Sequence, residues 1–274
     1  MLDKMLANVR EAAPLVHCIT NYVTVNDVAN ILLAAGGAPI MADEPDDAVD
    51  ITSICGGLDI NIGTLNARTI PSMFACGARA RELGHPVLLD PVGAGASKLR
   101  TDTANRLVDE LDLSCIRGNS SEIKAIALGS TTTKGVEADI ADVVTDSNLQ
   151  ATVAFAEEFA DRVGSVVAIT GAIDVIADGS HAFAIRNGHP VMSKITGSGC
   201  MLSALVTAFL VANPDDLLMA TVAAVAAEGV CGEKAAVKMV ETGVGNSTYR
   251  DYLIDNVYLL TPDELERDAR VEEF

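Results

Sequence analysis

Short apolar segments rich in β-branched residues alternate along this chain with longer segments rich in alanine. The apolar segments lack the polar–apolar alternation of a half-exposed strand, which is typical of parallel strands buried on both faces. The expected strands are 15–19, 38–40, 58–62, 87–89, one that ends at 115–116, and 166–169. Because helical segments lie between them, the pattern predicts an α/β fold with helices on both faces of one mostly parallel sheet.

The helices expected between these strands are 25–35, 70–83, 102–111 and 149–163. Gly36 and Gly84 follow two of them directly, which is typical of helix C-termini. In the second half of the chain, 174–177 and 182–185 flank the turn Asp178-Gly179-Ser180 and predict an antiparallel hairpin. Two apolar helices, 201–211 and 215–240, are expected to close the chain.

No linker or internal repeat divides the chain, so residues 1–274 are predicted to form a single domain. The polar interval 129–146 is interpreted as a surface connection. The acidic tail 261–274 is interpreted as a solvated helix or a frayed end.

The charge balance excludes several classes of partner. There are 38 Asp and Glu against 19 Lys and Arg, for a net charge of −19. A field of this sign repels polyanions at long range, so we expect neither nucleic acid nor an anionic membrane as a partner. Of the acids 23 are Asp, and only 7 residues are Lys. The surface is either that of an ordinary acidic protein or an adaptation to a high-salt cytoplasm.

The chain is expected to be cytoplasmic. Its first residues carry charges and lack the apolar stretch of a signal peptide. The longest apolar run, 200–212, is well short of the roughly 20 residues that a membrane span needs. The six cysteines are scattered without metal-ligand spacing and are interpreted as reduced thiols.

The segment Ile195-Thr196-Gly197-Ser198-Gly199-Cys200 directly precedes an apolar helix. Glycines before a helix let backbone N–H groups converge, and the helix N-terminus adds partial positive charge, which together suit a transferred phosphate. The alternative is a tight turn into a buried helix. Cys200 falls in the first helical turn, where we expect a lowered thiol pKa and a base or nucleophile. A small buried apolar residue is the alternative.

Two further motifs follow predicted strands. Asp90 ends a strand and precedes a glycine-rich loop, so its carboxylate lies where α/β sheets bind ligands and can hold Mg²⁺, or it caps the next turn. Arg117 and Glu122 flank Asn119. The guanidinium group of Arg117 can bind phosphate, and Glu122 can supply a second carboxylate for Mg²⁺. Alternatively, Asn119 and Glu122 can form a capping box at the start of a helix.

Polar residues also gather at the corner between a strand and the helix 25–35. The segment 21–30 fits a small-ligand pocket, and it fits N-capping by Thr24 equally well. Met41 can line an apolar pocket or pack in the hydrophobic core. No HExxH, GxSxG or Walker A pattern occurs, which argues against metalloprotease, α/β-hydrolase and P-loop functions.

Taken in order, five segments resemble the hydroxyethylthiazole kinase family of the ribokinase-like superfamily. They are ITNYVTVNDVAN at 19–30, NIGTL at 61–65, DPVGAGAS at 90–97, RGNSSEI at 117–123 and TGSGCMLSAL at 196–205. The resemblance implies a three-layer sandwich. It also implies phosphorylation of the alcohol of 4-methyl-5-(2-hydroxyethyl)thiazole by ATP and Mg²⁺ in thiamine biosynthesis, by a homotrimer with active sites between subunits.

The resemblance also assigns residues. Mg²⁺ would be held by Asp90 and Glu122, and the nucleotide by Arg117, Thr170, Gly171, Gly197 and Gly199. The thiazole pocket would comprise Asn21, Val23, Met41, Gly63, Gly197 and Cys200. The catalytic residues would be Arg117 and Cys200. The wider superfamily has Asp as general base where this chain has Cys200, so we expect the thiol to orient the substrate hydroxyl and to help only modestly as a base.

Two other classes remain as alternatives. An ADP-dependent hydrate dehydratase has a related anion loop but is expected to carry Asp at position 200. A non-catalytic nucleotide-binding module would not need both Asp90 and Glu122 beside an arginine.

Overall fold

The computed structural model describes residues 1–129 and 143–274, and its central feature is a nine-stranded sheet with the order β2-β1-β3-β4-β5-β6-β7-β8-β9. All strands from β2 to β6 run parallel, and β7, β8 and β9 continue the sheet antiparallel. The strands are β1 Leu15–Ile19, β2 Ala38–Ile40, β3 Gly57–Asn61, β4 Val87–Asp90, β5 Cys115–Asn119, β6 Val166–Thr170, β7 Asp174–Ala177, β8 Ala182–Ile185 and β9 Val271–Glu273.

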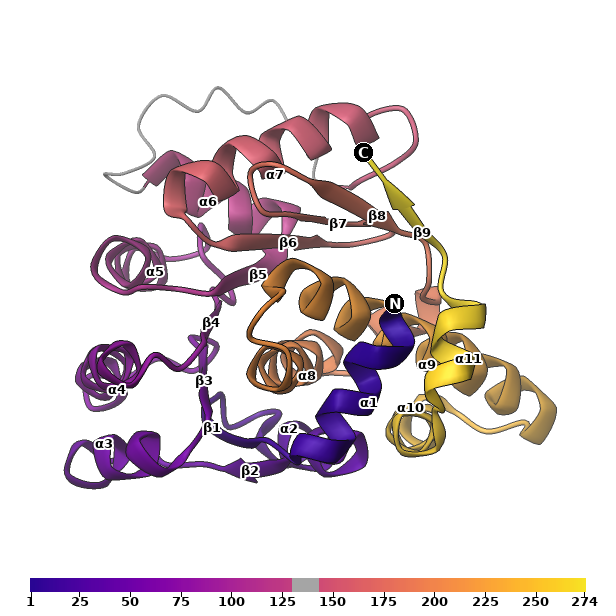
Figure 1. Cartoon of the computed structure of the whole chain (residues 1–274), viewed down its shortest axis with the longest axis horizontal. Helices are drawn as coiled ribbons and strands as arrows, with labels where there is room; N and C mark the ends of the chain where they lie inside the picture. The colour runs from indigo at the N-terminus through magenta and orange to yellow at the C-terminus, as the bar shows by residue number, and fades with distance from the viewer. Residues whose placement is uncertain (130–142) are drawn as a thin grey trace.

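Helices cover both faces of this sheet (Figure 1). One layer contains α3 Pro45–Ile54, α4 Thr69–Leu83, α5 Lys98–Glu110, α6 Ser120–Gly129 and α7 Leu149–Val163. The other contains α1 Leu2–Ala12, α2 Val25–Ala35, α8 Ser198–Ala212, α9 Leu217–Thr242, α10 Asn246–Leu259 and α11 Pro262–Asp268. The single-domain three-layer arrangement expected from the sequence is confirmed.

Two hydrophobic cores lie between the sheet and its helical layers. In β4, Leu88 packs on the α8 side, whereas Val87 and Leu89 pack on the α4 side. A strand buried on both faces gains nothing from alternating polar and apolar residues, which explains its continuous apolar sequence. Helix α8 is buried around most of its circumference because α1, α2 and α9 surround it against the sheet.

Apart from β5, the predicted strands and the hairpin form within one residue of their expected bounds. Residue 115 begins β5, and the strand continues to Asn119 rather than ending at 116. In the hairpin turn, Asp178 Oδ1 accepts hydrogen bonds from the backbone N–H groups of Ser180 and His181. The helix expected at 102–111 begins earlier, at Lys98, because the hydroxyl of Ser97 accepts a hydrogen bond from Arg100 N and caps it.

The prediction that two apolar helices close the chain is wrong, because α10, α11 and β9 follow them. The acidic tail is not frayed: Thr261 and Glu264 form a reciprocal capping box at the start of α11. Strand β9 then pairs with β8, with Glu273 opposite Phe183. Main-chain hydrogen bonds therefore order the C-terminal segment, although its many acidic residues are typical of solvent-exposed chain.

Most of the interval 129–146, expected to be a surface connection, lies outside the described residues. Within 1–129 and 143–274, no helix combines the length and apolar character that a membrane crossing requires.

Candidate active site

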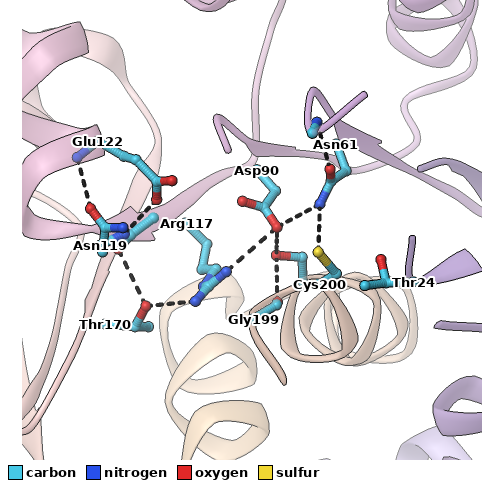
Figure 2. A network of polar contacts seen from close by, with 12 residues as sticks. Thr24, Asn61, Asp90, Arg117, Asn119, Glu122, Thr170, Gly199 and Cys200 are labelled. Atoms are coloured by element: carbon cyan, nitrogen blue, oxygen red, sulfur yellow. Dashed lines mark hydrogen bonds and ion pairs between the residues drawn. The ribbon is translucent and has the colours of Figure 1, made fainter. Parts of the chain in front are cut away.

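Four neighbouring parallel strands end in polar residues at one edge of the sheet. Asn61 ends β3 directly opposite Asp90 at the end of β4, and Asn119 ends β5 opposite Thr170 at the end of β6. Because parallel strands present their carboxyl ends at the same edge, these side chains gather around the N-terminus of α8 (Figure 2).

Asp90 is completely buried at this edge. Its Oδ2 accepts hydrogen bonds from Asn61 Nδ2 at 2.8 Å and from the Ser203 hydroxyl at 2.9 Å. Its Oδ1 has no hydrogen-bond partner among the described residues, and the side chain does not cap the following turn. Burial raises the pKa of Asp90 to about 6, against the opposing effect of the positive charge of Arg117.

Arg117 connects Asp90 to the neighbouring strand. Its Nη1 lies 3.5 Å from Asp90 Oδ2, and its Nη2 donates a hydrogen bond of 2.7 Å to the Thr170 hydroxyl. The guanidinium group packs against Gly199, where an added Cβ would lie 2.7 Å from Nη1. The absence of a side chain at Gly199 therefore lets α8 approach the arginine closely.

Glu122 takes part in the expected capping box. Asn119 Oδ1 accepts from Glu122 N at 2.9 Å, while Glu122 Oε2 accepts from Asn119 N at 3.0 Å. Its other oxygen, Oε1, accepts from Gly93 N at 2.8 Å. The capping interpretation is confirmed. The same contacts fix the carboxylate beside the glycine-rich loop after Asp90, and a carboxylate oxygen with one hydrogen bond can accept more.

Cys200 lies in the first turn of α8 and is buried. Its Sγ accepts hydrogen bonds from Asn21 Nδ2 at 3.1 Å and from Asn61 Nδ2 at 3.2 Å. Burial raises the pKa of this thiol, and the negative charge of Asp90 adds to the effect. The expected lowering of its pKa is therefore wrong, because loss of solvation outweighs the helix N-terminus and the donated hydrogen bonds.

Asn21 organises the loop that precedes α2. Its Oδ1 accepts hydrogen bonds from Val23 N and from the hydroxyl of Thr24, both at 3.1 Å. Thr24 occupies the N-cap position of α2, but its side chain makes no capping hydrogen bond. Gly63 packs against Asn21, since an added Cβ would lie 2.9 Å from Asn21 Cβ.

The remaining residues of the predicted thiazole pocket are less enclosed. Val23 is exposed, and Met41 is half-buried against the helical cluster around α8. Gly197 has a φ of +89°, and an added Cβ would lie 2.6 Å from Thr24 Cγ2. The lack of a side chain at Gly197 therefore lets the start of α8 pack closely against Thr24.

A cavity of about 620 Å³ opens beside Arg117. Of the residues predicted to bind nucleotide, it is lined by Arg117, Thr170, Gly171 and Gly199. Among the described residues its lining does not include Asn21, Val23, Met41, Gly63, Gly197 or Cys200. Four of the five predicted nucleotide residues therefore line this cavity, whereas Gly197, which was predicted for both sites, and the other thiazole residues do not.

Three residues of this region, Asn61, Ser203 and Glu228, were not predicted from the sequence to have a role. Asn61 bridges Asp90 and Cys200 through one amide nitrogen, and Ser203 donates to Asp90 from one turn further along α8. The position of Asn61 at the end of a strand is a signal that could have identified it. Glu228 lines the cavity from α9, 28 residues after the glycine-rich segment ends at Cys200, and it lies in no local motif.

Comparisons with known proteins show which family this chain resembles over its whole length. The hydroxyethylthiazole kinase family matches residues 6–263. A hydroxyethylthiazole kinase of Clostridium acetobutylicum is 56% identical over 274 residues, with both chains fully covered. The solved hydroxyethylthiazole kinase protein of Pyrococcus horikoshii is 33% identical and superposes with a TM-score of 0.88, covering 100% of this chain and 98% of that one.

A more distant structure shows the fold alone. A ribokinase-like superfamily protein of Enterococcus faecalis superposes with a TM-score of 0.60 at 12% identity, covering 94% of this chain and 89% of that one. The family match spans nearly the whole chain and includes every strand from β1 to β8. The chain therefore belongs to the hydroxyethylthiazole kinase family.

Proposed function

We propose that this protein transfers the terminal phosphoryl group of ATP to the hydroxyl group of 4-methyl-5-(2-hydroxyethyl)thiazole, as a step of thiamine biosynthesis. The observation that carries the proposal is the meeting of three features at one edge of the sheet. These are the buried carboxylate of Asp90, the guanidinium of Arg117 and the N-terminus of α8, all beside a cavity of about 620 Å³. Family membership supports the choice of thiazole alcohol as acceptor.

The residues present fit a magnesium ion. Asp90 Oδ1 is a buried oxygen without a partner among the described residues, and the contacts of Glu122 with Gly93 and Asn119 hold a second carboxylate nearby. No three His, Cys, Asp or Glu side chains in the described ranges cluster into a complete metal site. This suits Mg²⁺, which takes one or two carboxylates and completes its shell with water and phosphate oxygens. When bound, it would neutralise charge on the phosphates.

The phosphates would lie between Arg117 and the first turn of α8. The guanidinium is held by Thr170 and Asp90, so it is positioned before the nucleotide arrives. Backbone N–H groups at Gly197 and Gly199 begin the helix and supply donors and partial positive charge to the transferred group. Thr170 and Gly171 would contact the nucleotide from the end of β6. Catalysis by positioning and charge neutralisation suits a loose phosphoryl-transfer transition state.

Cys200 would orient the acceptor hydroxyl. Its thiol is neutral near pH 7 because its pKa is raised, which makes it a weak base. The two asparagine amides that donate to Sγ fix the sulfur in place. Proton removal from the acceptor therefore contributes little, in agreement with the loose transition state.

Asn21, Val23, Met41, Gly63 and Gly197 would bind the thiazole ring. Because Val23 is 65% exposed and Met41 is half-buried, an apolar ring bound there needs further cover. A homotrimer with active sites between subunits would supply that cover from a second copy of the chain. We further propose a cytoplasmic location, in accord with cysteines that are unpaired throughout the described residues.

Release of ADP tests the proposed function. With ATP, Mg²⁺ and the thiazole alcohol, we expect ADP and a thiazole phosphate in equal amounts, and little ADP without the alcohol. Asp90→Asn should lower kcat by roughly a hundredfold or more, as removal of electrostatic stabilisation does elsewhere. Asp50→Asn, on the exposed face of α3, is the matched control. Absence of thiazole-dependent ADP release would refute the kinase, and turnover of a hydrated nicotinamide nucleotide instead would establish the dehydratase.

A further inference from the structure

The cavity beside Arg117 contains two acidic side chains that the proposed chemistry does not use, Asp174 and Glu228. Glu228, on α9, lines this cavity and is only 4% exposed. Its Oε1 is buried and has no hydrogen-bond partner among the described residues. A buried polar atom without a partner is destabilising, so such an atom in a binding cavity suggests a contact that a ligand completes.

Glycines on α9 bring the helix close to the segment that follows β8. A Cβ at Gly229 would lie 2.6 Å from Asn187 Cβ, and a Cβ at Gly232 would lie 2.6 Å from Met192 Sδ. Side chains at either position would push α9 away from the segment that follows β8. Asn187 itself is engaged elsewhere, because its Nδ2 donates to Asp268 O and its Oδ1 accepts from Arg270 N. The position of α9, and with it that of Glu228, is therefore fixed by close packing against this segment.

Apolar side chains share this cavity with Glu228. Leu202 from α8, Val225 one turn before Glu228 on α9, and Met192 all line the same cavity. An aromatic ring buries its faces well between such side chains, whereas the hydroxyl groups of a sugar would lose water there without compensation. The phosphate-binding residue Arg117 lies in the same cavity, so a nucleotide can reach both.

We propose that Glu228 is a specificity-determining residue that recognises the adenine ring of the phosphate donor, pairing its carboxyl group with the exocyclic amino group and the adjacent ring nitrogen. This inference rests on the proposed function, since it takes the cavity as the nucleotide site. Asp174 is a weaker choice for the same role, because it is half-buried and its Oδ1 already accepts from Gly171 N.

The protonation state of Glu228 favours adenine over guanine. Burial raises the pKa of this carboxyl to about 8; the positive charge of Arg117 opposes the effect and the negative charge of Asp174 adds to it. Cys231 on α9 and Tyr249 on α10 also interact with Glu228 electrostatically, and burial raises the pKa of each well above neutral pH. A neutral carboxylic acid presents one donor and one acceptor side by side, as the adenine edge requires. Guanine instead presents two neighbouring N–H donors on one edge, and only an ionised carboxylate could accept hydrogen bonds from both.

Nucleotide analogues test this assignment. The wild-type chain and Glu228→Leu would be compared for KM and kcat with ATP, GTP and purine riboside triphosphate, which lacks the amino group, at pH 7. We expect the wild type to prefer ATP over the other two by roughly tenfold or more in kcat/KM. Glu228→Leu should raise KM for ATP by roughly tenfold with little change in kcat, and should abolish the preference over purine riboside triphosphate.

Glu228→Gln is the conservative variant, because an amide also presents a donor beside an acceptor. It should retain the preference for ATP, and Glu241→Leu on the exposed end of α9 should leave every constant unchanged. An unchanged preference for ATP in Glu228→Leu, or a wild-type preference for GTP, would overturn the proposal.

A binding measurement separates this proposal from the proposed function. Calorimetry of ADP and purine riboside diphosphate, without the thiazole alcohol, compares the same amino group in the absence of any reaction. If the wild type fails to phosphorylate the thiazole, the proposed function fails, but tighter binding of ADP that is lost in Glu228→Leu still supports the role of Glu228. Equal binding of the two diphosphates by the wild type contradicts it.

Discussion

The guanidinium group of Arg117 occupies the space where a side chain at Gly199 would lie. An added Cβ would be 2.7 Å from Nη1 and 2.9 Å from Nη2. The first turn of α8 and the arginine at the end of β5 therefore form one surface, and the side chains that hold the arginine, Asp90 and Thr170, come from the strands on either side.

Gly199→Ala should displace Arg117 from this position. The arginine would then leave Thr170 and Asp90, so we expect the KM for ATP to rise by roughly tenfold or more, in line with loss of a charge-assisted contact. Steady-state kinetics with the thiazole alcohol at saturation measure this. Gly245→Ala is the control, because an added Cβ there meets no atom within 4 Å. An unchanged KM in Gly199→Ala would show that the position of Arg117 does not matter for nucleotide binding.

Cys200→Asp should retain turnover or raise it. A carboxylate can accept the same hydrogen bonds that Asn21 and Asn61 now donate to Sγ, and it is a stronger base at neutral pH than a thiol with a raised pKa. We expect Cys200→Ser to keep kcat within roughly an order of magnitude, since a weak base contributes little to a loose transition state. Complete inactivity of both variants, in protein that melts like the wild type, would establish an essential thiol.

Replacing Asp59 should stabilise the fold. This residue is completely buried on β3 between Cys18 and Leu88, and neither carboxylate oxygen has a partner among the described residues. Asp59→Leu exchanges an unsatisfied polar group for an apolar side chain of similar size. It should therefore raise the free energy of unfolding by about 1–3 kcal/mol at pH 7, as measured by urea denaturation.

The gain from Asp59→Leu should depend on pH. Burial raises the pKa of Asp59 well above its ordinary value, so the folded state binds the proton more tightly than the unfolded state. The wild type consequently loses stability as pH rises above the unfolded pKa near 4, until the folded pKa is passed. The advantage of Asp59→Leu should be smallest near pH 4 and should grow toward pH 8. Asp50→Asn is the exposed control, and an advantage that shrinks with rising pH would contradict this account.

Salt should stabilise the protein. The net charge of −19 creates self-repulsion among surface carboxylates, and ions shorten the range of that repulsion. If the acidity is an adaptation to a high-salt cytoplasm, the melting temperature should rise between low and multimolar KCl. Sucrose at matched osmolality controls for solute exclusion. A melting temperature that does not change with KCl would exclude adaptation to high salt, and the protein would then be an ordinary acidic protein.

Local sequence patterns predicted most of the sheet because a buried parallel strand must be apolar on both faces. The bounds of β1 and β2 match the expected segments, and α2 ends at Gly36, whose φ of +99° suits glycine. Two elements that were not predicted, β9 and α10, lack such signals. Strand β9 is acidic and exists because the edge of β8 offers main-chain partners, and α10 is recognisable only by its packing on α9.

For the site, the sequence by itself determined which motifs follow strands, and so which polar residues share one edge: Asp90, Arg117, Glu122 and Thr170. It could not determine the environment of each group. Burial raises the pKa of the Cys200 thiol and outweighs the hydrogen bonds that Asn21 and Asn61 donate from distant segments. Only the tertiary structure placed Glu228 in the cavity beside Arg117. Solvation and partners depend on what packs around an atom, and a linear sequence carries no record of those neighbours.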